Sequence, residues 1–438
     1  MRPDGRSRAA DAVQMALEAG AADAFATDST SRDVEFSYRD GALEKVQDST
    51  SRSIALELYV AGRYSAHRTT DLEPDRLRAF IREAVALTRA LEPDEYRRIT
   101  PPELFAERPD VDLDLVDPAV EALAREQRLA WSAALDEASH AHGRVLSATA
   151  MVFDGSFASS EAGSNGFAGS RRSTYCWFGS SVTLRDRGDR RAEDSCFVGG
   201  THLADLPEAQ GVGTTALERA VARLDAGKGP SGRMTMVVDA RAASMLVGRL
   251  LGGAYAQAVQ QGRSFWAPLV GTRAFSEKLD ITDDPLIVRG LASRLYDAEG
   301  ISAKVLPIVK AGVVENLYVD TYYGRKAGMA PTTGSASNVR VGTGTQSLAE
   351  LLRDAGEGVY VTSWLGGNAD STTGDFSLGL RGHMIENGAV GRPVGEMNVT
   401  GNLKTLFSRL EAVGNDPYPY ATILSPSLVF SGVDFSGA

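Results

Sequence analysis

The sequence predicts an α+β fold in two parts, an N-terminal α/β domain followed by a C-terminal domain of mostly antiparallel strands. Predicted strands and helices come in blocks rather than in strict alternation, which is typical of α+β proteins. No short-period repeat is visible, so a solenoid is not expected. Glycines and a proline gather in Gly227-Lys228-Gly229-Pro230. We therefore divide the chain into residues 1–229 and residues 230–438.

The N-terminal half opens with a predicted helix and a set of strands. Residues 8–20 carry apolar side chains at helical spacing and end at a glycine, which favours a helix end. Apolar side chains then alternate on both sides of Asp40-Gly41, a dipeptide typical of tight hairpin turns. Residues 73–90 repeat apolar side chains at three- and four-residue spacing, which predicts a helix. Proline and acidic residues crowd residues 92–117, so we expect an exposed connector there.

A helix, a sheet and a second helix are expected after the connector. The pair Asp117-Pro118 is a favourable helix start, and we expect one helix from there to about residue 140. Between residues 145 and 198, short alternating segments are broken by glycine, serine and asparagine, and Ser164-Asn165-Gly166 is a strong hairpin-turn signal. This pattern predicts an antiparallel sheet of short strands. A helix over about 208–225 leads to the boundary.

The C-terminal half is predicted to be rich in strands with glycine turns. The expected elements are a strand over Met234–Val238, a helix over 240–259, mostly short strands over 285–400, two helices near 347–355 and 402–411, and a closing strand around Leu428–Phe430.

Composition and charge exclude several classes of protein. The chain of 438 residues has a formal net charge of −11 and a pI near 5.1, which disfavours a general binder of nucleic acid or of anionic membranes. No stretch of eighteen apolar residues and no secretory signal is visible. The two cysteines, Cys176 and Cys196, have neither metal nor disulfide-framework spacing. We expect two reduced thiols in a cytoplasmic protein without a membrane partner or direct nucleic-acid contact.

No motif in the chain supplies a complete catalytic centre. A zinc-peptidase helix needs two imidazoles on one face and a glutamate beside them. None of the five histidines forms such a pair. The sequence also has neither a phosphate-binding G-x-x-x-x-G-K-[ST] loop nor a G-x-S-x-G nucleophile elbow. The motifs alone therefore indicate a protein with no self-sufficient catalytic centre.

Charged residues on glycine-rich turns of the second half are the remaining candidates for a site. Arg294 and Asp297 stand in one such turn, Asp375 in a second, and the pair Asn415 and Asp416 in a third. These side chains could contact a ligand. Aspartate and asparagine more often build the turn itself through local hydrogen bonds. The residues alone leave both interpretations open.

Short segments along nearly the whole chain resemble the TldD/TldE (PmbA) family of bacterial proteins, which is grouped with metallopeptidases. The resemblance is stronger in the C-terminal half, because these segments occur there in the family's order and spacing. The segments that carry it are Gly20–Asp23, Gly41–Glu44, Val60–Arg63, Thr69–Leu72, Ser164–Gly166, Gly290–Gly300, Thr373–Ser377, Ile385–Gly388, Gly401–Leu403 and Val413–Asp416. The resemblance implies a two-part fold of the TldD/PmbA kind.

The resemblance also implies which metal ligands this chain lacks. The TldD branch carries an H-E-x-x-x-H helix and a C-terminal cysteine as its metal site. The corresponding positions here fall near Val247, Gly248 and Gly252, and the cysteine region falls at Pro417–Tyr420. Val247, Gly248 and Gly252 can neither hold a metal nor act as a general base, and Pro417–Tyr420 contains no thiolate. Such a loss is typical of the TldE (PmbA) branch, so no cofactor is expected in this chain, and zinc or a similar metal is expected in a TldD-like partner.

The leading hypothesis is a noncatalytic subunit of a cytoplasmic metallopeptidase heterodimer that degrades or processes unfolded peptides. In this hypothesis Arg294, Asp297 and Asp375 have structural or peptide-contact roles. Asn415 and Asp416 could have the same roles. A peptide bound by strand addition would explain tolerance of many sequences.

Two other hypotheses remain open. The chain could be a stand-alone homodimer that binds peptides or acts as a scaffold. It could also be a diverged hydrolase that uses Asp297 and Asp375 as an acid/base pair.

Overall fold

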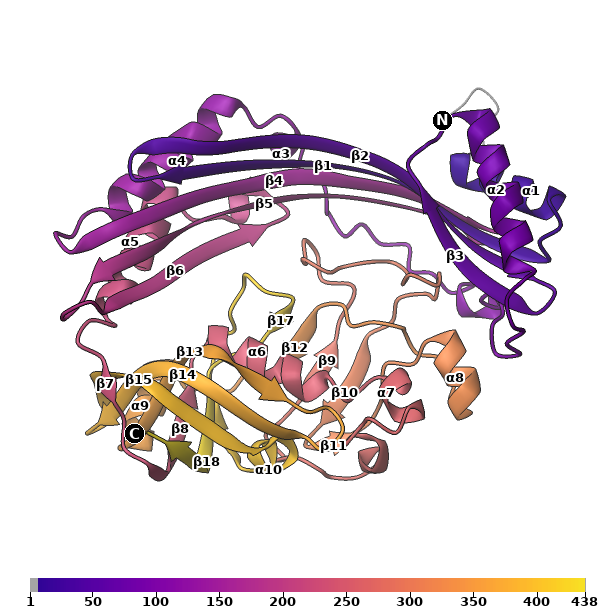
Figure 1. The fold of residues 1–438 in the computed structure, drawn as a ribbon. Coiled ribbons are helices and arrows are strands. Elements are labelled where there is room, and N and C mark those ends of the chain that lie inside the picture. The colour runs from indigo at the N-terminus through magenta and orange to yellow at the C-terminus, as the bar shows by residue number, and fades with distance from the viewer. Residues whose placement is uncertain (1–6, 438) are drawn as a thin grey trace.

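A curved six-stranded sheet arches over a β-rich C-terminal body in the computed structural model, which describes residues 7–437 (Figure 1). The strand order of the arch is β3-β2-β1-β4-β5-β6, and every neighbouring pair is antiparallel. The N-terminal elements are α1 (Arg8–Glu18), β1 (Asp23–Arg39), β2 (Ala42–Val60), β3 (Arg63–Thr69), α2 (Pro74–Thr88), α3 (Pro118–Glu121), α4 (Arg125–Ser139), β4 (Val145–Gly163), β5 (Ala168–Arg185), β6 (Arg191–Gly200) and α5 (Ala209–Val221), with 3-10 turns at Pro102–Leu104 and Leu203–Asp205.

The hairpin turns of the arch follow local sequence signals. Asp40 and Gly41 have φ of 48° and 84°, so the predicted Asp-Gly turn joins β1 to β2. The loop that contains Gly166, whose φ is 90°, joins β4 to β5 as predicted. The dipeptide Ala61-Gly62 joins β2 to β3 with φ of 51° and 75°. In each turn a glycine takes a left-handed position, and in two of the turns the residue before it, Asp40 or Ala61, is left-handed as well.

Two pairs of helices cover the ends of the arch, on the face away from the C-terminal body (Figure 1). At one end α1 and α2 pack on Ile54, Leu56 and Leu58 of β2. At the other end α4 and α5 pack on a core that includes Val152 and Phe178. The other face of the arch is left for the C-terminal body.

The C-terminal body is built on two sheets around one large apolar core. Its elements are β7 (Gly227–Lys228), β8 (Gly232–Val238), α6 (Ala240–Leu251), α7 (Ala256–Gln260), β9 (Ile281–Asp283), β10 (Leu306–Lys310), β11 (Val313–Val314), α8 (Thr321–Ala327), β12 (Val339–Val341), α9 (Leu348–Ala355), β13 (Gly358–Ala369), β14 (Asp375–Glu386), β15 (Ala389–Asn402), α10 (Leu403–Ser408), β16 (Leu410–Val413), β17 (Ile423–Leu424) and β18 (Leu428–Ser436), with a 3-10 turn at Ala267–Leu269.

Strand β18 closes most of the larger sheet on itself. The sheet order is β16-β18-β8-β13-β14-β15-β7, and β18 pairs with β15 as well as with β8. The smaller sheet has the order β11-β10-β9-β12-β17. Helix α6 lies between the two sheets, since it contacts both β13 and β17. Most pairings in both sheets are antiparallel, which confirms the predicted α+β class.

Two of the predicted helices are in fact broken. The helix expected from Asp117 to residue 140 is split into α3 and α4, because residues 122–124 leave the helical path. The helix expected over 240–259 ends at Leu251, and α7 begins at Ala256. A Cβ at Gly253 would lie 2.7 Å from the buried Trp266 ring, so the chain turns where only glycine fits.

The strands predicted as short are long where glycine faces an aromatic side chain. Strands β4 and β5 have 19 and 18 residues. Glycines in them continue the strand instead of ending it. A Cβ at Gly155 would lie 2.7 Å from the Tyr175 hydroxyl, and one at Gly179 would lie 2.6 Å from the Phe197 ring. By contrast, residues 285–305, predicted as strands, form turns and irregular backbone.

A buried ion pair fastens α4 to the arch. Arg128 donates to both carboxylate oxygens of Asp154 at 2.5 and 2.6 Å, and the two side chains are 5% and 2% exposed. Within residues 7–437, no helix is long and apolar enough to cross a membrane.

Asp154→Ala is expected to destabilise the N-terminal part by about 3–5 kcal/mol, because the guanidinium of Arg128 stays buried without its partner. Urea unfolding followed by circular dichroism measures the change. The double variant Arg128→Met/Asp154→Leu is expected to recover much of the loss. A single variant as stable as the wild type would contradict the role given to this pair.

Candidate functional site: a groove beneath the arch

A groove runs between the arch and the C-terminal body. It consists of two adjoining cavities of about 1020 and 680 Å³, which share Thr201, Gly290, Leu291 and Ala421. Strands β4 and β5, the connector at 111–116 and the C-terminal loops all contribute to its walls. Segments far apart in the sequence therefore make this site together.

Side chains of β5 and β4 form the roof of the groove. Arg171, Tyr175 and Trp177 lie on one face of β5, because an even number of positions separates each pair. The Tyr175 hydroxyl donates to Asp33 at 2.6 Å, which fixes the ring. Phe157 of β4 reaches the same cavity and is 39% exposed. The roof thus presents aromatic surface with polar tips.

The loop that forms the floor is pinned by one asparagine and one arginine. Asn338 accepts from the Ala292 amide at 2.9 Å and donates to the Ser293 hydroxyl at 2.8 Å. Arg289 donates to Asp114 of the connector at 2.6 Å. Arg289 also has a φ of 57°, an uncommon backbone conformation for a side chain of this kind. The floor is therefore held from both parts of the chain.

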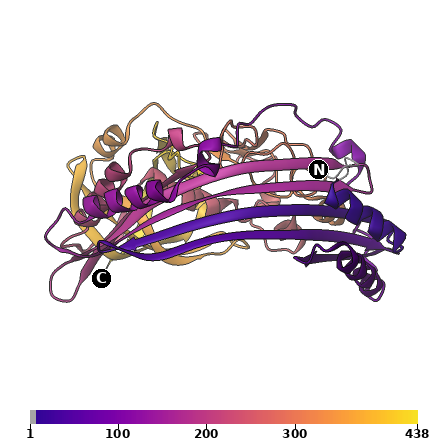
Figure 2. The ribbon, with the colours of Figure 1, turned by 90° about the horizontal axis from the view of Figure 1, so that it is seen from above.

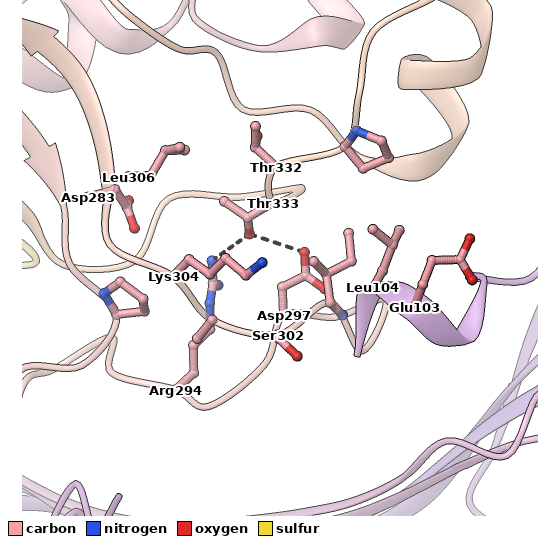
Figure 3. A pocket seen from close by; sticks show the side chains of 14 residues that line it. Glu103, Leu104, Asp283, Arg294, Asp297, Ser302, Lys304, Leu306, Thr332 and Thr333 are labelled. Carbon is pink, nitrogen blue, oxygen red and sulfur yellow. Dashed lines mark hydrogen bonds between the residues drawn. The ribbon is translucent and has the colours of Figure 1, made fainter. Parts of the chain in front are cut away.

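Arg294 and Asp297, two predicted site residues, line one small pocket of about 180 Å³ next to the groove (Figure 3). Thr333 lies between them and bonds to both, at 3.2 Å to Arg294 and 3.1 Å to Asp297. Asp297 also accepts the amides of Glu299, Ile301 and Gly334 at 2.9 to 3.0 Å. All of these hydrogen bonds organise the turn. Burial also lowers the pKa of the Arg294 guanidinium below its ordinary value.

The other predicted residues lie elsewhere. Asp375 begins β14, where it is exposed and accepts from Asn402 at 2.9 Å. Asp416 accepts from the amide and hydroxyl of Ser427 at 3.0 and 2.7 Å. Asn415 donates to the Thr345 carbonyl at 3.1 Å. None of the three lines the pocket of Arg294, so Asp375 does not form an acid/base pair with Asp297 there.

One buried carboxyl group, Asp283, and one half-buried carboxyl group, Glu299, were not singled out from the sequence. Asp283 lines the Arg294 pocket and accepts from Ser337 and from the Tyr318 hydroxyl, and burial raises its pKa. Glu299 accepts from the amide and hydroxyl of Thr321 at 2.8 and 2.6 Å. Burial raises the pKa of Glu299 to about 7. Their burial arises from distant segments, so no local pattern marks them.

The positions expected for a metal site do not share one face. Val247 is fully buried in the C-terminal core, whereas Gly252 is exposed at the end of α6. Gly248 faces Ile423, whose Cδ1 would lie 3.3 Å from a Cβ there. The Ser244 hydroxyl donates to the Ile423 carbonyl at 2.7 Å, so α6 and the segment after Asp416 are neighbours.

The residues present do not fit the metal that the resemblance associates with this region. Val247, Gly248 and Gly252 have no side-chain nitrogen, oxygen or sulfur. Across the described residues 7–437, no group of three or more histidine, cysteine, aspartate or glutamate side chains could hold a metal ion. No chemical step is therefore assigned to a metal in this chain.

A two-part α+β protein with a groove between its parts is the class that fold and site define. Family models described as PmbA/TldA metallopeptidase domain 1 and C-terminal domain match residues 22–88 and 231–437. A structure from Bacteroides thetaiotaomicron, described as a proposed modulator of DNA gyrase, is 34% identical with a TM-score of 0.96 and covers 100% of this chain and 99% of that one. The chain belongs to the PmbA/TldD family.

More distant relatives agree with this assignment. Metalloprotease PmbA of Escherichia coli O157:H7 is 27% identical over 98% of this chain and 96% of its own length. The structure of TldE from Thermococcus kodakarensis has a TM-score of 0.84 at 16% identity, covering 98% of this chain and 100% of that one, which shows a shared fold.

Glu299→Gln is expected to flatten the dependence of stability on pH between about 4.5 and 7. The pKa of Glu299 is raised to about 7 in the folded chain, so the folded state binds the extra proton and the wild type loses stability as pH rises through this window. The free energy of unfolding falls by on the order of 2–3 kcal/mol across this window when the pKa of a carboxyl group is raised this far. Urea unfolding at several pH values measures it.

Glu92→Gln, at an exposed glutamate of the connector, serves as the control and should keep the wild-type pH dependence. If the free energy of unfolding changes with pH equally in Glu299→Gln and in the wild type, the raised pKa of Glu299 is contradicted.

Proposed function

We propose that this chain is the metal-free, TldE-like subunit of a TldD/TldE-type metallopeptidase that degrades or processes unfolded peptides. The proposal is carried by the position of two segments, those in which the resemblance expects metal ligands and in which this chain has none. Pro417, Pro419 and Tyr420, at the region of the missing cysteine, line the smaller cavity of the groove. Ile423 follows them and packs on α6. The groove thus meets the region of the lost metal site.

The shape and lining of the groove suit an extended peptide. Clefts that bind ligands are mostly apolar with a few placed polar groups. Phe157 and Trp177 provide apolar surface, and the Tyr175 hydroxyl and the Arg171 guanidinium provide polar groups. A site that contacts backbone and apolar surface accepts many side-chain sequences. This property is what a peptidase for unfolded chains needs.

The proposal divides the work between two subunits. A TldD-like partner would carry zinc or a similar metal, and this chain would bind and orient the peptide. The names of relatives, Metalloprotease PmbA and TldE, support this placement within a peptidase family. Both cysteines are free, which agrees with an assembly in the cytoplasm. A homodimeric peptide-binding or scaffold protein without catalytic activity is the alternative outcome.

The test is co-purification of this chain with the TldD-like protein of the same genome, followed by metal analysis and a peptide-cleavage assay on each alone and on the mixture. We expect a complex with the metal in the partner and cleavage only in the mixture. Stoichiometric metal and chelator-sensitive cleavage by this chain alone would overturn the proposal. Peptide binding without any response to the partner would favour the scaffold alternative.

Phe157→Ala is expected to raise KM for peptide cleavage by the mixture roughly three- to tenfold, because one exposed aromatic contact in the groove is removed. The metal content should not change. Leu146→Ala is the matched control, since Leu146 is also 39% exposed on β4 but does not line either cavity. Equal KM values for the two variants would argue against peptide binding in the groove.

A further inference from the structure

A pocket beside the groove contains a positive charge without an ion-pair partner. This side pocket, the cavity of about 180 Å³ that is lined by Arg294, Asp297 and Ser302 among others, lies next to the larger cavity of the groove, and Arg294 lines both. Seen from above, the strands of the arch extend along the C-terminal body (Figure 2). A chain held in the groove beneath them therefore meets the Arg294 side chain, and through it the side pocket.

The hydrogen bonds of Arg294 leave part of its guanidinium free. Its Nη1 donates to the Ser335 hydroxyl at 3.0 Å, and its Nη2 donates to the Thr333 hydroxyl at 3.2 Å and to the Ser335 carbonyl. A guanidinium has five N–H donors. One donor on Nη1 and the donor on Nε are therefore without a partner in residues 7–437, and no carboxylate of these residues forms an ion pair with Arg294.

The two buried aspartates of the side pocket are already occupied. Asp297 accepts three backbone amides and the Thr333 hydroxyl. Asp283 accepts from the amide and the hydroxyl of Ser337 and from the Tyr318 hydroxyl. Because these donors belong to the chain itself, the aspartates serve the local structure and leave the unused donors of the pocket for a ligand.

The positive charge of Arg294 is only partly compensated by its surroundings. Burial lowers the pKa of its guanidinium, and the charge of nearby Arg171 acts in the same direction. Asp297 and Asp283 act in the opposite direction, but they do not offset the lowering. An anion placed against the free N–H groups would supply the missing negative charge.

Two further donors line the side pocket. Ser302 is 3% exposed, and within residues 7–437 its hydroxyl has no hydrogen-bond partner, which is uncommon for a buried polar group. Lys304 is paired with Glu107 at 3.4 Å, but both side chains are exposed, and such pairs are weak. In Figure 3 the side chains of Arg294 and Lys304 point into the pocket. The pocket thus offers a guanidinium, an ammonium and a hydroxyl group.

We propose that Arg294 and Ser302 bind a carboxylate group of a peptide that lies in the groove, with Lys304 at the edge of the side pocket. A carboxylate accepts strong, charge-assisted hydrogen bonds from a guanidinium. The volume of about 180 Å³ is ample for this group, since a single water needs only about 10–15 Å³. The inference rests on the proposed function, because it names the chemical group by which the groove recognises a peptide.

The carboxylate has two possible sources, the C-terminus of the peptide and an acidic side chain. A C-terminal carboxylate is present whatever the sequence, which agrees with a groove that accepts many sequences. Three labelled peptides of equal length distinguish the sources. The first is neutral with an amidated C-terminus, the second has the same sequence with a free C-terminus, and the third is amidated and contains one internal glutamate.

Fluorescence anisotropy with the full-length chain measures binding of each peptide and needs neither a metal nor a partner. We expect at least one carboxylate peptide to bind about tenfold more tightly than the neutral peptide, as for one hydrogen bond to a charged group. The peptide that shows this preference identifies the source of the carboxylate. The same preference is expected as a lower KM for cleavage by the mixture with the TldD-like protein.

Arg294→Gln is expected to bring the ratio of the affinities for carboxylate and neutral peptides close to one. Ser302→Ala removes a hydroxyl that has no partner in the described chain, so the fold should be unchanged while the preference falls about threefold. Arg353→Gln is the control for the loss of one positive charge, since Arg353 is exposed on α9 and lines neither the groove nor the side pocket. It should keep the wild-type ratio. Circular dichroism checks that all three variants fold.

The outcomes separate this inference from the proposed function. Equal affinity of the wild type for all three peptides, or an unchanged preference in both Arg294→Gln and Ser302→Ala, would overturn the carboxylate site and leave the proposed function standing. If the chain binds no peptide either alone or with the TldD-like protein, the inference and the proposed role in peptide binding both fail.

Discussion

The ring of Tyr296 holds the arch to the loop that closes the groove, and the geometry of the site depends on this contact. Tyr296 is 2% exposed, and its ring centre lies 5.1 Å from that of Phe167 in an edge-to-face arrangement. Its hydroxyl donates to Glu161 of β4 at 2.7 Å. Arg171 lies 4.2 Å from the ring centre and donates to the Asp297 carbonyl at 2.6 Å. One aromatic residue is thus bound by apolar, hydrogen-bond and cation–π contacts together.

Two glycines make room for this contact. A Cβ at Gly169 would lie 2.5 Å from the Tyr296 hydroxyl, and one at Gly300 would lie 2.7 Å from the Phe167 ring. Gly300 also has a φ of 84°, which a larger residue rarely adopts. Burial raises the pKa of the Tyr296 phenol, so its hydroxyl stays a hydrogen-bond donor to Glu161 over the ordinary pH range. Close packing of these rings therefore fixes where the loop of Tyr296 meets the arch.

Local signals in the sequence predict the parts of the fold that local forces decide. Helices α1 and α2, strand β8 and the turn at Asp40-Gly41 follow from periodicity and turn chemistry, and the structure has them close to the expected bounds. The break at Gly253 depends on Trp266, and the length of β4 depends on Tyr175 across the sheet. These contacts are made in the folded chain and leave no local pattern.

At the candidate site, too, local features could be predicted from the sequence and tertiary features could not. Arg294 and Asp297 were predicted to lie in one turn, and they do line one pocket. The groove itself could not be predicted, because its walls come from β4, β5, the connector and two C-terminal loops that meet only after folding. Asp283 and Glu299 likewise become unusual through burial, a property of the tertiary structure.

Helix α6 is held in the C-terminal body by apolar packing and hydrogen bonds. Its residues Leu246, Val247 and Leu250 are fully buried in the C-terminal core, and the Trp364 indole donates to the Ala242 carbonyl at 2.9 Å. These contacts do not involve a metal. Because apolar packing and these hydrogen bonds hold α6 between the two sheets, Gly248, which faces Ile423, needs no side chain to keep the helix in place. The helix therefore keeps its place in the core although Val247, Gly248 and Gly252 have no side chain that could ligate a metal.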